Sequence, residues 1–229
     1  EFMRRVEADD SWELKAVITG ETLETLKARE VMDWITDAAW HSADPGMQFD
    51  TTINGWHTLP NTGKINASNP CSEYMSVDNS ACNLASLNLL RFLQVDGSFN
   101  VELFKRAVDT LITSQEIIVG NSSYPTEKIT KNAIDFRQLG LGYANLGSLL
   151  MNMGLAYDSD RGRTIAGAIT SIMCGNAYLM SAKLAAIKGP FSGYELNREP
   201  MLRIIKKHGL AAENLANLFD STDTDGRLA

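Results

Sequence analysis

Residues 69–89 read NPCSEYMSVDNSACNLASLNL, and this stretch joins an irregular loop to an apolar run. The loop covers residues 54–80, which are rich in Asn, Ser, Gly, Pro and Thr, residue types that favour turns. The apolar run, residues 84–93, fits a strand or a buried helix. A connection of this length inside a compact domain is usually functional or disordered. Because Cys71 and Cys82 lie in or beside it, we expect function there.

Strand and helix periodicities alternate on both sides of this loop. Alternation of apolar residues predicts short strands at residues 12–18 and 47–53. Apolar residues three and four positions apart predict helices, the second of them capped by Asn100. Their approximate ranges are 25–41, 100–120, 143–154, 160–187 and from Pro200 onward. Strands that alternate with helices favour an α/β fold class.

The composition limits the classes of function. The chain has 229 residues, 44% hydrophobic and 21% charged, which suits one large domain or part of one. A net charge of -7 argues against a nucleic-acid polymer as partner. No apolar run approaches the roughly 18 residues of a membrane helix, and no export leader precedes the domain. Three cysteines are too few for a disulfide scaffold, so reduced thiols and a cytoplasmic location are expected.

Three chemically different side chains occupy alternate positions in the loop. Asn69, Cys71 and Glu73 would point to one side of an extended segment, about 7 Å apart at successive positions, and Pro70 favours that extension. An amide can orient a hydroxyl, a carboxylate can take its proton, and a thiol can act as nucleophile, reductant or radical carrier. Alternatively, Asn-Pro and Ser-Glu form turns and caps around a buried cysteine, and the spacing does not separate these two interpretations.

Four segments, in the same order along the chain, resemble the adenosylcobalamin-dependent (class II) ribonucleotide reductases. They are residues 60–68, 69–73, 81–89 and 135–147. The similarity extends over about residues 1–210. Several long motifs in sequence make this a more specific match than any one short pattern, and Asn69-Pro70-Cys71 with the run after Ala81 favours the cobalamin class over the diiron class.

This resemblance implies a role for each matching residue in the reduction of ribonucleotides, such as diphosphates, to deoxyribonucleotides. Cys71 would carry a thiyl radical that takes the 3′ hydrogen of the ribose. Glu73 would accept the 3′-hydroxyl proton, and Asn69 would hydrogen-bond the ribose hydroxyls. Cys82 would be one of two cysteines that reduce the substrate and become a disulfide. Adenosylcobalamin is the implied cofactor, a thiol reductant such as thioredoxin the implied partner, and a homodimer an implied assembly.

The resemblance also implies the architecture. Residues 1–229 would be a partial catalytic domain, one part of a ten-stranded α/β barrel, with residues 66–75 as the finger loop that enters its centre. The second reducing cysteine of the family lies upstream of the finger loop, and no cysteine precedes Cys71. A phosphate loop of the Pro-x-Gly-Thr type and a C-terminal cysteine pair do not occur either. We therefore expect the rest of a parent chain as a partner, and no activity from this chain alone.

Other interpretations of the same residues remain open. A cysteine hydrolase would use Cys71 as nucleophile and His57 as base. A zinc site of His41, His57 and Cys71 lacks the usual ligand spacing, so no metal is expected. A non-catalytic α/β interaction module is the remaining alternative. Cys174 is expected to fill space in its helix.

Glycines around residue 140 suggest a nucleotide-binding loop. Gly140, Gly142 and Gly147 lie close together, but the dinucleotide pattern requires a glycine where Asn145 stands. We therefore expect these glycines to permit close packing of a strand against a helix.

Overall fold

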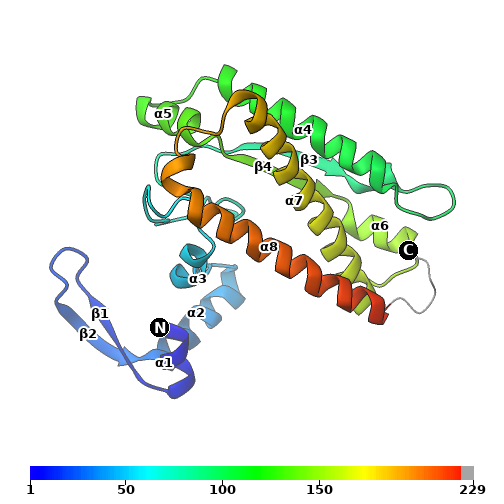
Figure 1. The fold of residues 1–229 in the computed structure, drawn as a ribbon. Coiled ribbons are helices and arrows are strands. Elements are labelled where there is room, and N and C mark those ends of the chain that lie inside the picture. The colour runs from blue at the N-terminus through cyan, green and yellow to red at the C-terminus, as the bar shows by residue number, and fades with distance from the viewer. Residues whose placement is uncertain (223–229) are drawn as a thin grey trace. The chain divides into compact units, whose positions relative to one another are not determined.

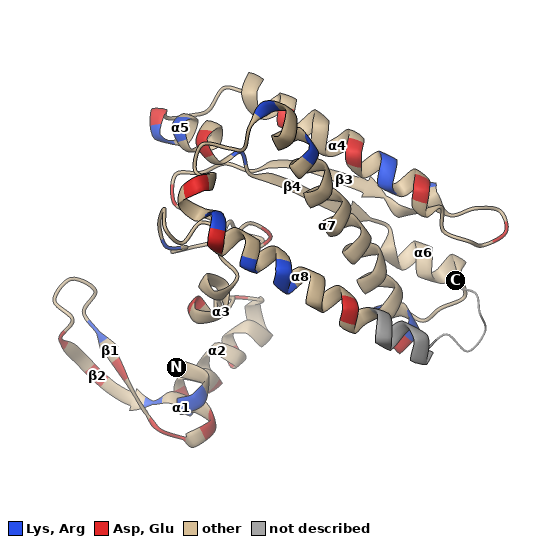
Figure 2. Cartoon of the chain, in the orientation of Figure 1, with Lys and Arg blue, Asp and Glu red and all other residues tan. Residues whose placement is uncertain are grey.

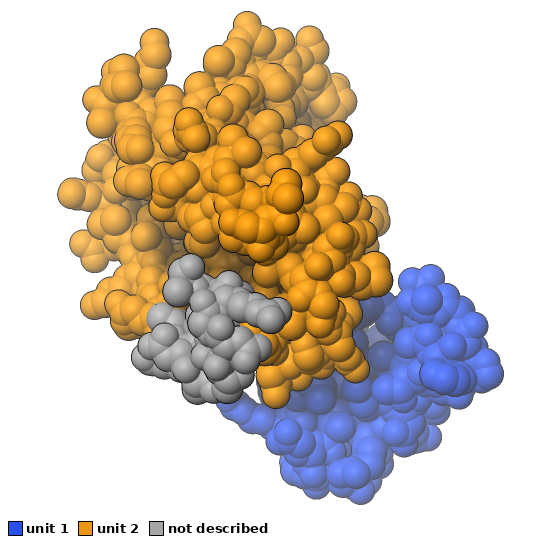
Figure 3. All heavy atoms as spheres, turned by 90° about the vertical axis from the view of Figure 1, so that its right-hand side faces the viewer, with its two compact units in different colours: residues 1–49 blue, residues 50–229 orange. Residues whose placement is uncertain are grey.

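The computed structural model describes residues 1–222, with side chains as far as residue 215. The chain divides into two compact units, and the division falls between Phe49 and Asp50 (Figure 3). The first unit is a small helix and hairpin assembly. The second contains the sheet, the long helices and the loop that carries Cys71 (Figure 1).

The first unit consists of α1 (Phe2–Ala8), β1 (Ser11–Lys15), β2 (Thr22–Lys27) and α2 (Ala28–Ser42). The two strands pair antiparallel. The rings of Phe2 and Trp12 meet edge to face with centroids 5.0 Å apart, and the Arg29 guanidinium donates to the carbonyl oxygen of Val6 at 3.1 Å. Ala28 is the one residue of this unit that is fully buried, so the unit has almost no apolar core of its own.

The sequence predicted part of this first unit. The strand predicted at residues 12–18 forms but ends at Lys15, where the hairpin turn begins. The predicted helix begins at Ala28 rather than near residue 25, because β2 pairs with β1 as far as Lys27. β2 was not predicted, since its apolar residues do not alternate and nearly all its side chains are exposed.

A parallel pair of strands lies at the centre of the second unit. β3 (Asn83–Asn88) pairs with β4 (Leu139–Ala144), with Leu84 opposite Gly140. Parallel strands require a crossover, which is supplied here by α4 (Val101–Asn121) and α5 (Glu127–Phe136). Asn100 caps α4 as predicted, because its side-chain oxygen accepts from the Leu103 N–H at 2.9 Å.

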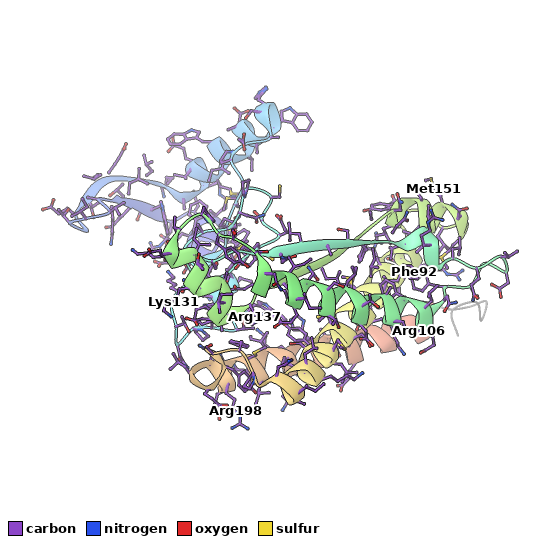
Figure 4. The ribbon with its side chains drawn as sticks, turned by 90° about the horizontal axis from the view of Figure 1, so that it is seen from above. Phe92, Arg106, Lys131, Arg137, Met151 and Arg198 are labelled. Atoms are coloured by element: carbon purple, nitrogen blue, oxygen red, sulfur yellow. The ribbon has the colours of Figure 1, made fainter. Side chains whose placement is uncertain are left out.

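One face of this sheet packs against helices. α4 contacts both strands, α7 (Asp160–Lys188) packs on α4, and α8 (Tyr194–Thr222) packs on α7 (Figure 4). The buried core joins β3, the short 3₁₀ helix η1 (Leu89–Phe92), α4, α6 (Leu146–Asn152) and α7. Its members are Leu87, Leu89, Phe92, Phe104, Val108, Ile112, Leu149, Leu150, Ile165, Ile169 and Met173. Leu84, Ser86 and Asn88 of β3 point to the other face and are exposed, so the two faces of the sheet differ sharply.

The structure confirms the mixed α/β class and several predicted elements, and it corrects others. The segment 84–93, predicted as strand or helix, contains both, as β3 and then η1. The strand predicted at residues 47–53 is wrong, because the helix α3 (Asp50–Gly55) forms there. Within this helix, the Asn54 side-chain N–H donates to the Asp50 carbonyl oxygen at 3.1 Å. The helix predicted near residue 143 begins at Leu146, and α5 was not predicted.

Helix α7 bears on the expectation that no segment spans a membrane. Among residues 1–222 it is the one helix that is long and apolar enough to do so by length and composition. It carries no charged residue between positions 164 and 182 (Figure 2). Its residues Ile165, Ile169 and Met173 belong to the core shared with α4, and a core helix of a folded domain meets the same criterion. This packing explains its apolar composition only in part, because 17% of the apolar stretch is buried among the described residues.

Candidate active site

The loop between α3 and β3 is held down by its own buried side chains. Leu59, Ile65 and Val77 are buried, and so is His57. The His57 Nε2 lies 2.8 Å from the Gly63 carbonyl oxygen, and its Nδ1 accepts from the Leu59 N–H at 3.3 Å. Both ring nitrogens therefore bond within the loop, and burial lowers the pKa of the imidazole. With both ring nitrogens bonded within the loop, His57 has a structural role and is not available as the base that a Cys71 hydrolase would need.

The same loop is fastened to α8 where that helix contains a proline. Pro200 was predicted to begin the helix, but it is the seventh residue of α8, which begins at Tyr194. A proline lacks the N–H that would bond the carbonyl four residues earlier, here that of Leu196. The Asn61 side chain supplies this bond, donating to the Leu196 oxygen at 2.8 Å. The fully buried Asn197 accepts from the Asn61 backbone N–H at 3.0 Å, which completes the junction.

The finger loop is closed by a bridge at its neck and turns tightly at its tip. Ser68 and Met75 form an isolated antiparallel bridge. The Asn69 side-chain oxygen accepts from the Tyr74 N–H at 3.0 Å, and the Asn69 carbonyl oxygen accepts from the Ser72 N–H at 3.1 Å. The backbone bond between Asn69 and Ser72 makes residues 69–72 a β-turn.

Cys71 lies in this turn with its side chain exposed, so its expected place at the tip of a loop is confirmed. The expected extended conformation of residues 69–73 is wrong. Ser72 has a left-handed φ of 63°, which reverses the chain after Cys71. The shared direction of the Asn69, Cys71 and Glu73 side chains stays a prediction. It no longer has the support of an extended segment.

Cys82 lies at the base of the long loop between α3 and β3, immediately before β3. It is half-buried, and its sulfur lies 3.7 Å from the Asn83 carbonyl oxygen. Burial raises the pKa of the Cys82 thiol to about 11, and the negative charge of the Glu73 carboxylate adds to this effect. The carboxylate two residues after Cys71 therefore acts electrostatically on Cys82, which links the tip of the loop to its base.

Polar side chains that the sequence did not single out surround Cys82. The Tyr74 hydroxyl donates to the Ser80 hydroxyl at 2.8 Å, and burial raises the pKa of this phenol, with a smaller contribution from Cys82. The Gln138 amide donates to the Ser76 hydroxyl at 3.2 Å. Tyr and Ser are common in loops, so no sequence signal marks this cluster, which forms only when β4 brings Gln138 beside the loop.

The start of β4 is fixed against α4 by an ion pair. Arg137, labelled in Figure 4, donates from Nε to a Glu116 carboxylate oxygen at 2.5 Å and from Nη2 to the Glu116 carbonyl oxygen at 2.8 Å. Its left-handed φ of 50° ends α5, as the residue after a helix commonly does. The adjoining Gln138 therefore has a defined position beside Asn83, whose N–H donates to the Gln138 carbonyl oxygen at 3.5 Å.

The remaining candidates do not join this site. Among the side chains that the structure describes, no three of His, Cys, Asp or Glu gather closely enough to hold a metal ion. Cys174 is half-buried in α7, in keeping with a space-filling role, and burial raises the pKa of its thiol. Gly140 does permit a close approach, but its neighbours are the Leu84 side chain, the Cys82 sulfur and the Asn83 carbonyl oxygen rather than a helix.

Comparisons with known proteins agree with the motifs of the loop. The family model for the ribonucleotide reductase barrel domain matches residues 1–224. A vitamin B12-dependent ribonucleotide reductase of Streptomyces avermitilis is 51% identical over 227 residues, which are 97% of this chain and 23% of that protein. The enzyme of the same name from Rhodopirellula baltica is 48% identical over 94% of this chain and 21% of its own length.

A more distant relative has the same chemistry in its name. A vitamin B12-dependent ribonucleoside-diphosphate reductase of Mycobacterium tuberculosis is 31% identical over 86% of this chain and 28% of its own length. The chain thus spans about a quarter of the length of the curated relatives that it matches.

Proposed function

Because this chain belongs to the ribonucleotide reductase barrel-domain family, we propose that its parent enzyme reduces ribonucleotides to deoxyribonucleotides with a radical carried by Cys71. The observation that carries this proposal is the arrangement of two cysteines on one loop. Cys71 is exposed at the tip, Cys82 is half-buried at the base, and the Glu73 carboxylate acts on Cys82. These are the positions that an initiating thiol, a reducing thiol and a proton acceptor require.

Adenosylcobalamin is the proposed cofactor, because the relatives are named as vitamin B12-dependent. A thiol that reacts with so large a group has to be reachable, and Cys71 fits because its side chain is exposed in a turn. When bound, this cofactor would supply the radical that removes the hydrogen atom of the Cys71 thiol. The residues that would face it are Cys71 and its neighbours in the turn.

Residues of the finger loop would then act on the ribose. The Cys71 sulfur takes the hydrogen from C3′, so the C3′–H bond breaks, an S–H bond forms and the unpaired electron passes to C3′. Glu73 accepts the 3′-hydroxyl proton, and the 2′-hydroxyl leaves as water after it takes a proton from a reducing thiol, a role that the protonated Cys82 can fill. The Asn69 side-chain oxygen already bonds the Tyr74 N–H, so Asn69 would act on the ribose hydroxyls through its amide N–H groups.

Cys82 would complete the reduction together with a second cysteine. Its raised pKa keeps it a protonated thiol at neutral pH, so it has a hydrogen to give. The net reaction converts a ribonucleotide and two thiols into a deoxyribonucleotide, a disulfide and water. The second cysteine would come from the rest of the parent chain, since Cys71, Cys82 and Cys174 are the cysteines here and Cys174 lies in α7.

The wider assembly follows from the same family. The strands β3 and β4 would belong to a ten-stranded barrel, with the exposed face of β3 toward its centre. The Mycobacterium relative's name favours a diphosphate substrate. A thiol reductant such as thioredoxin, a homodimer and a cytoplasmic location complete the proposal.

Turnover by the full-length parent protein tests this function. With adenosylcobalamin, a dithiol and each common ribonucleoside di- and triphosphate, we expect deoxyribonucleotide from the parent and none from this chain alone. After a single turnover without reductant, Cys82 should be protected from alkylation. No product from any substrate would refute the assignment, and full alkylation of Cys82 after turnover would remove Cys82 from the mechanism.

A further inference from the structure

We infer that Gly140 is a positioning residue for the reducing thiol: its missing side chain leaves the space that the Cys82 sulfur occupies, and Gln115 fixes the carbonyl group beside that sulfur. This inference rests on the proposed function, in which Cys82 supplies electrons to the substrate. Neither Gly140 nor Gln115 touches the reacting atoms. Both act through Cys82.

The space around Gly140 is filled from three directions. An added Cβ would lie 2.9 Å from the Cys82 sulfur, 2.5 Å from the Leu84 Cδ2 and 3.4 Å from the Asn83 carbonyl oxygen. Carbon atoms in contact are about 3.5–4.0 Å apart at best, so two of these distances would be repulsive. Gly140 does not have a left-handed φ. Glycine is therefore required for the space and not for the backbone conformation.

The two crowded side chains differ in their freedom to move. Leu84 is 63% exposed, so its end can swing into solvent. Cys82 has one side-chain torsion, and its backbone is held because the Asn83 N–H donates to the Gln138 carbonyl oxygen at 3.5 Å. A side chain at residue 140 would therefore displace the sulfur into another rotamer.

Gln115 fixes the other side of the thiol from the core of α4. It is 2% exposed, and its Nε2 donates to the Asn83 carbonyl oxygen at 2.9 Å and to the Gly140 carbonyl oxygen at 2.8 Å. The Asn83 oxygen is also the acceptor that lies 3.7 Å from the Cys82 sulfur. One amide thus bonds the carbonyl groups of both residues that border the thiol.

The side-chain oxygen of Gln115 supports this interpretation. It is buried and has no hydrogen-bond partner in the part of the chain that the structure describes. An apolar side chain of similar size would leave no such atom unbonded, so packing does not explain an amide here. The two hydrogen bonds that the amide donates to the Asn83 and Gly140 carbonyl oxygens explain it. They matter for function because disulfide formation requires the two Cβ atoms about 3.8 Å apart and a narrow range of torsions.

The test compares two glycines of β4 in the full-length parent without cobalamin. Gly140→Ala is made in a Leu84→Ala background, which removes the contact with Leu84 and leaves that with the sulfur. Gly142→Ala in the same background is the matched control, because its Cβ would meet only the Ser86 hydroxyl, at 3.7 Å. The rate of alkylation of each cysteine is followed by mass spectrometry of its peptide.

We expect Gly140→Ala to change the alkylation rate of Cys82 about tenfold and to leave Cys71 unchanged, because reactivity follows the local environment of the thiol. In the loaded enzyme, kcat should fall with little change in KM, since substrate binding is not touched. Gly142→Ala should change neither. Equal alkylation of Cys82 in the two variants would overturn the inference.

A double-mutant cycle keeps the inference testable if Gly140→Ala folds poorly. The loss of stability caused by Gly140→Ala should be smaller when Cys82→Ala removes the sulfur, and equal losses would overturn the inference. The proposed function fails separately. If Cys82 of the unaltered enzyme is not protected from alkylation after turnover, the role of Cys82 in reduction is refuted. The alkylation rates of the variants and the double-mutant cycle would still decide whether Gly140 positions the Cys82 sulfur.

Discussion

The long loop between α3 and β3 presents a cysteine in opposite ways at its tip, residues 69–73, and at its base, where the chain enters β3. At the tip, Cys71 is exposed in a turn that backbone hydrogen bonds and the Asn69 side chain hold. At the base, Cys82 is half-buried between β3 and β4, with Gln115 and Gly140 beside it. The first thiol is positioned by local sequence, and the second by residues far away in the chain.

This difference matches the chemistry proposed for each thiol. A thiol that exchanges hydrogen with a cofactor and then with a substrate has to be reachable from outside the protein. A thiol that must form a disulfide with one partner needs a fixed position and has to remain protonated until it reacts. A protein can meet both needs on one loop by exposing the tip and burying the base.

The largest effect should come from exchanging the two thiols for hydroxyls in the parent enzyme. Cys71→Ser and Cys82→Ser should each lower product formation by more than about 10³-fold, because a hydroxyl neither carries the radical nor supplies electrons at this potential. A ribonucleotide tritiated at C3′ should separate them. Only the enzyme with Cys71 takes up this hydrogen as an S–H group, which exchanges with water.

Release of tritium to water is therefore expected from Cys82→Ser and not from Cys71→Ser. Cys174→Ser is the control, and it should retain turnover because Cys174 lies in α7 rather than beside the loop. If Cys71→Ser still released tritium, the two thiols would not have the separate roles that the tip and base suggest.

The second effect is a difference in thiol reactivity of about 100-fold. Since the pKa of Cys82 is raised from 9.0 to about 11, its thiolate fraction at pH 8 is about 100-fold lower than that of an ordinary cysteine. Alkylation of Cys82 should accelerate by at least this factor when the parent is unfolded in denaturant. If the alkylation rate of Cys82 in the folded parent had its midpoint near pH 9, the burial of this thiol would be refuted.

The same shift predicts a loss of stability in alkali. The folded protein binds the Cys82 proton more tightly than the unfolded chain does, so the stabilisation is complete below about pH 9 and is lost as the pH rises toward 11. Cys82→Ser removes this dependence. The difference in unfolding free energy between the parent and this variant should therefore narrow between these two pH values.

The contrast between tip and base also explains what the sequence could predict. The loop and the Asn100 cap depend on residues close together in the chain, and local patterns indicated them. The position of Cys82 beside Gln115 and Gly140 depends on the pairing of β3 with β4. These two strands are separated in the sequence by the crossover through α4 and α5. No period or motif in either strand shows that Gly140 lies against a sulfur.

The proline of α8 shows the same limit. Pro200 was predicted to begin a helix, because an interior proline leaves the carbonyl four residues earlier without a bond. Asn61 supplies that bond from a loop 135 residues away. A proline does leave this carbonyl group without a partner inside the helix, but here the tertiary contact with Asn61 provides one. The strand predicted at residues 47–53 failed for a related reason, since no neighbouring strand pairs with it.

A third effect should appear in stability. Gln115→Met keeps the length of the side chain but leaves the Asn83 and Gly140 carbonyl oxygens without its two bonds. The loss should be about 2 kcal/mol, or about 30-fold in the unfolding equilibrium, by denaturant titration of the parent. Ile117→Met, on the exposed side of the same helix, is the control and should stay within about 0.5 kcal/mol. Equal changes would show that Gln115 only fills space.

The smallest effect tests the electrostatic link between tip and base. Glu73→Gln removes the carboxylate charge but not the burial, which is the larger cause of the raised pKa of Cys82. The pKa should therefore fall only partly, and alkylation of Cys82 at pH 8 should accelerate roughly two- to threefold. Because salt screens charges near the surface, 1 M NaCl should reduce this difference. Cys174, whose pKa is raised by burial alone, provides the internal control and should react at an unchanged rate. An unchanged rate for Cys82 would mean that the Glu73 carboxylate does not act on the base of the loop, and the two thiols would then have to be described as independent sites.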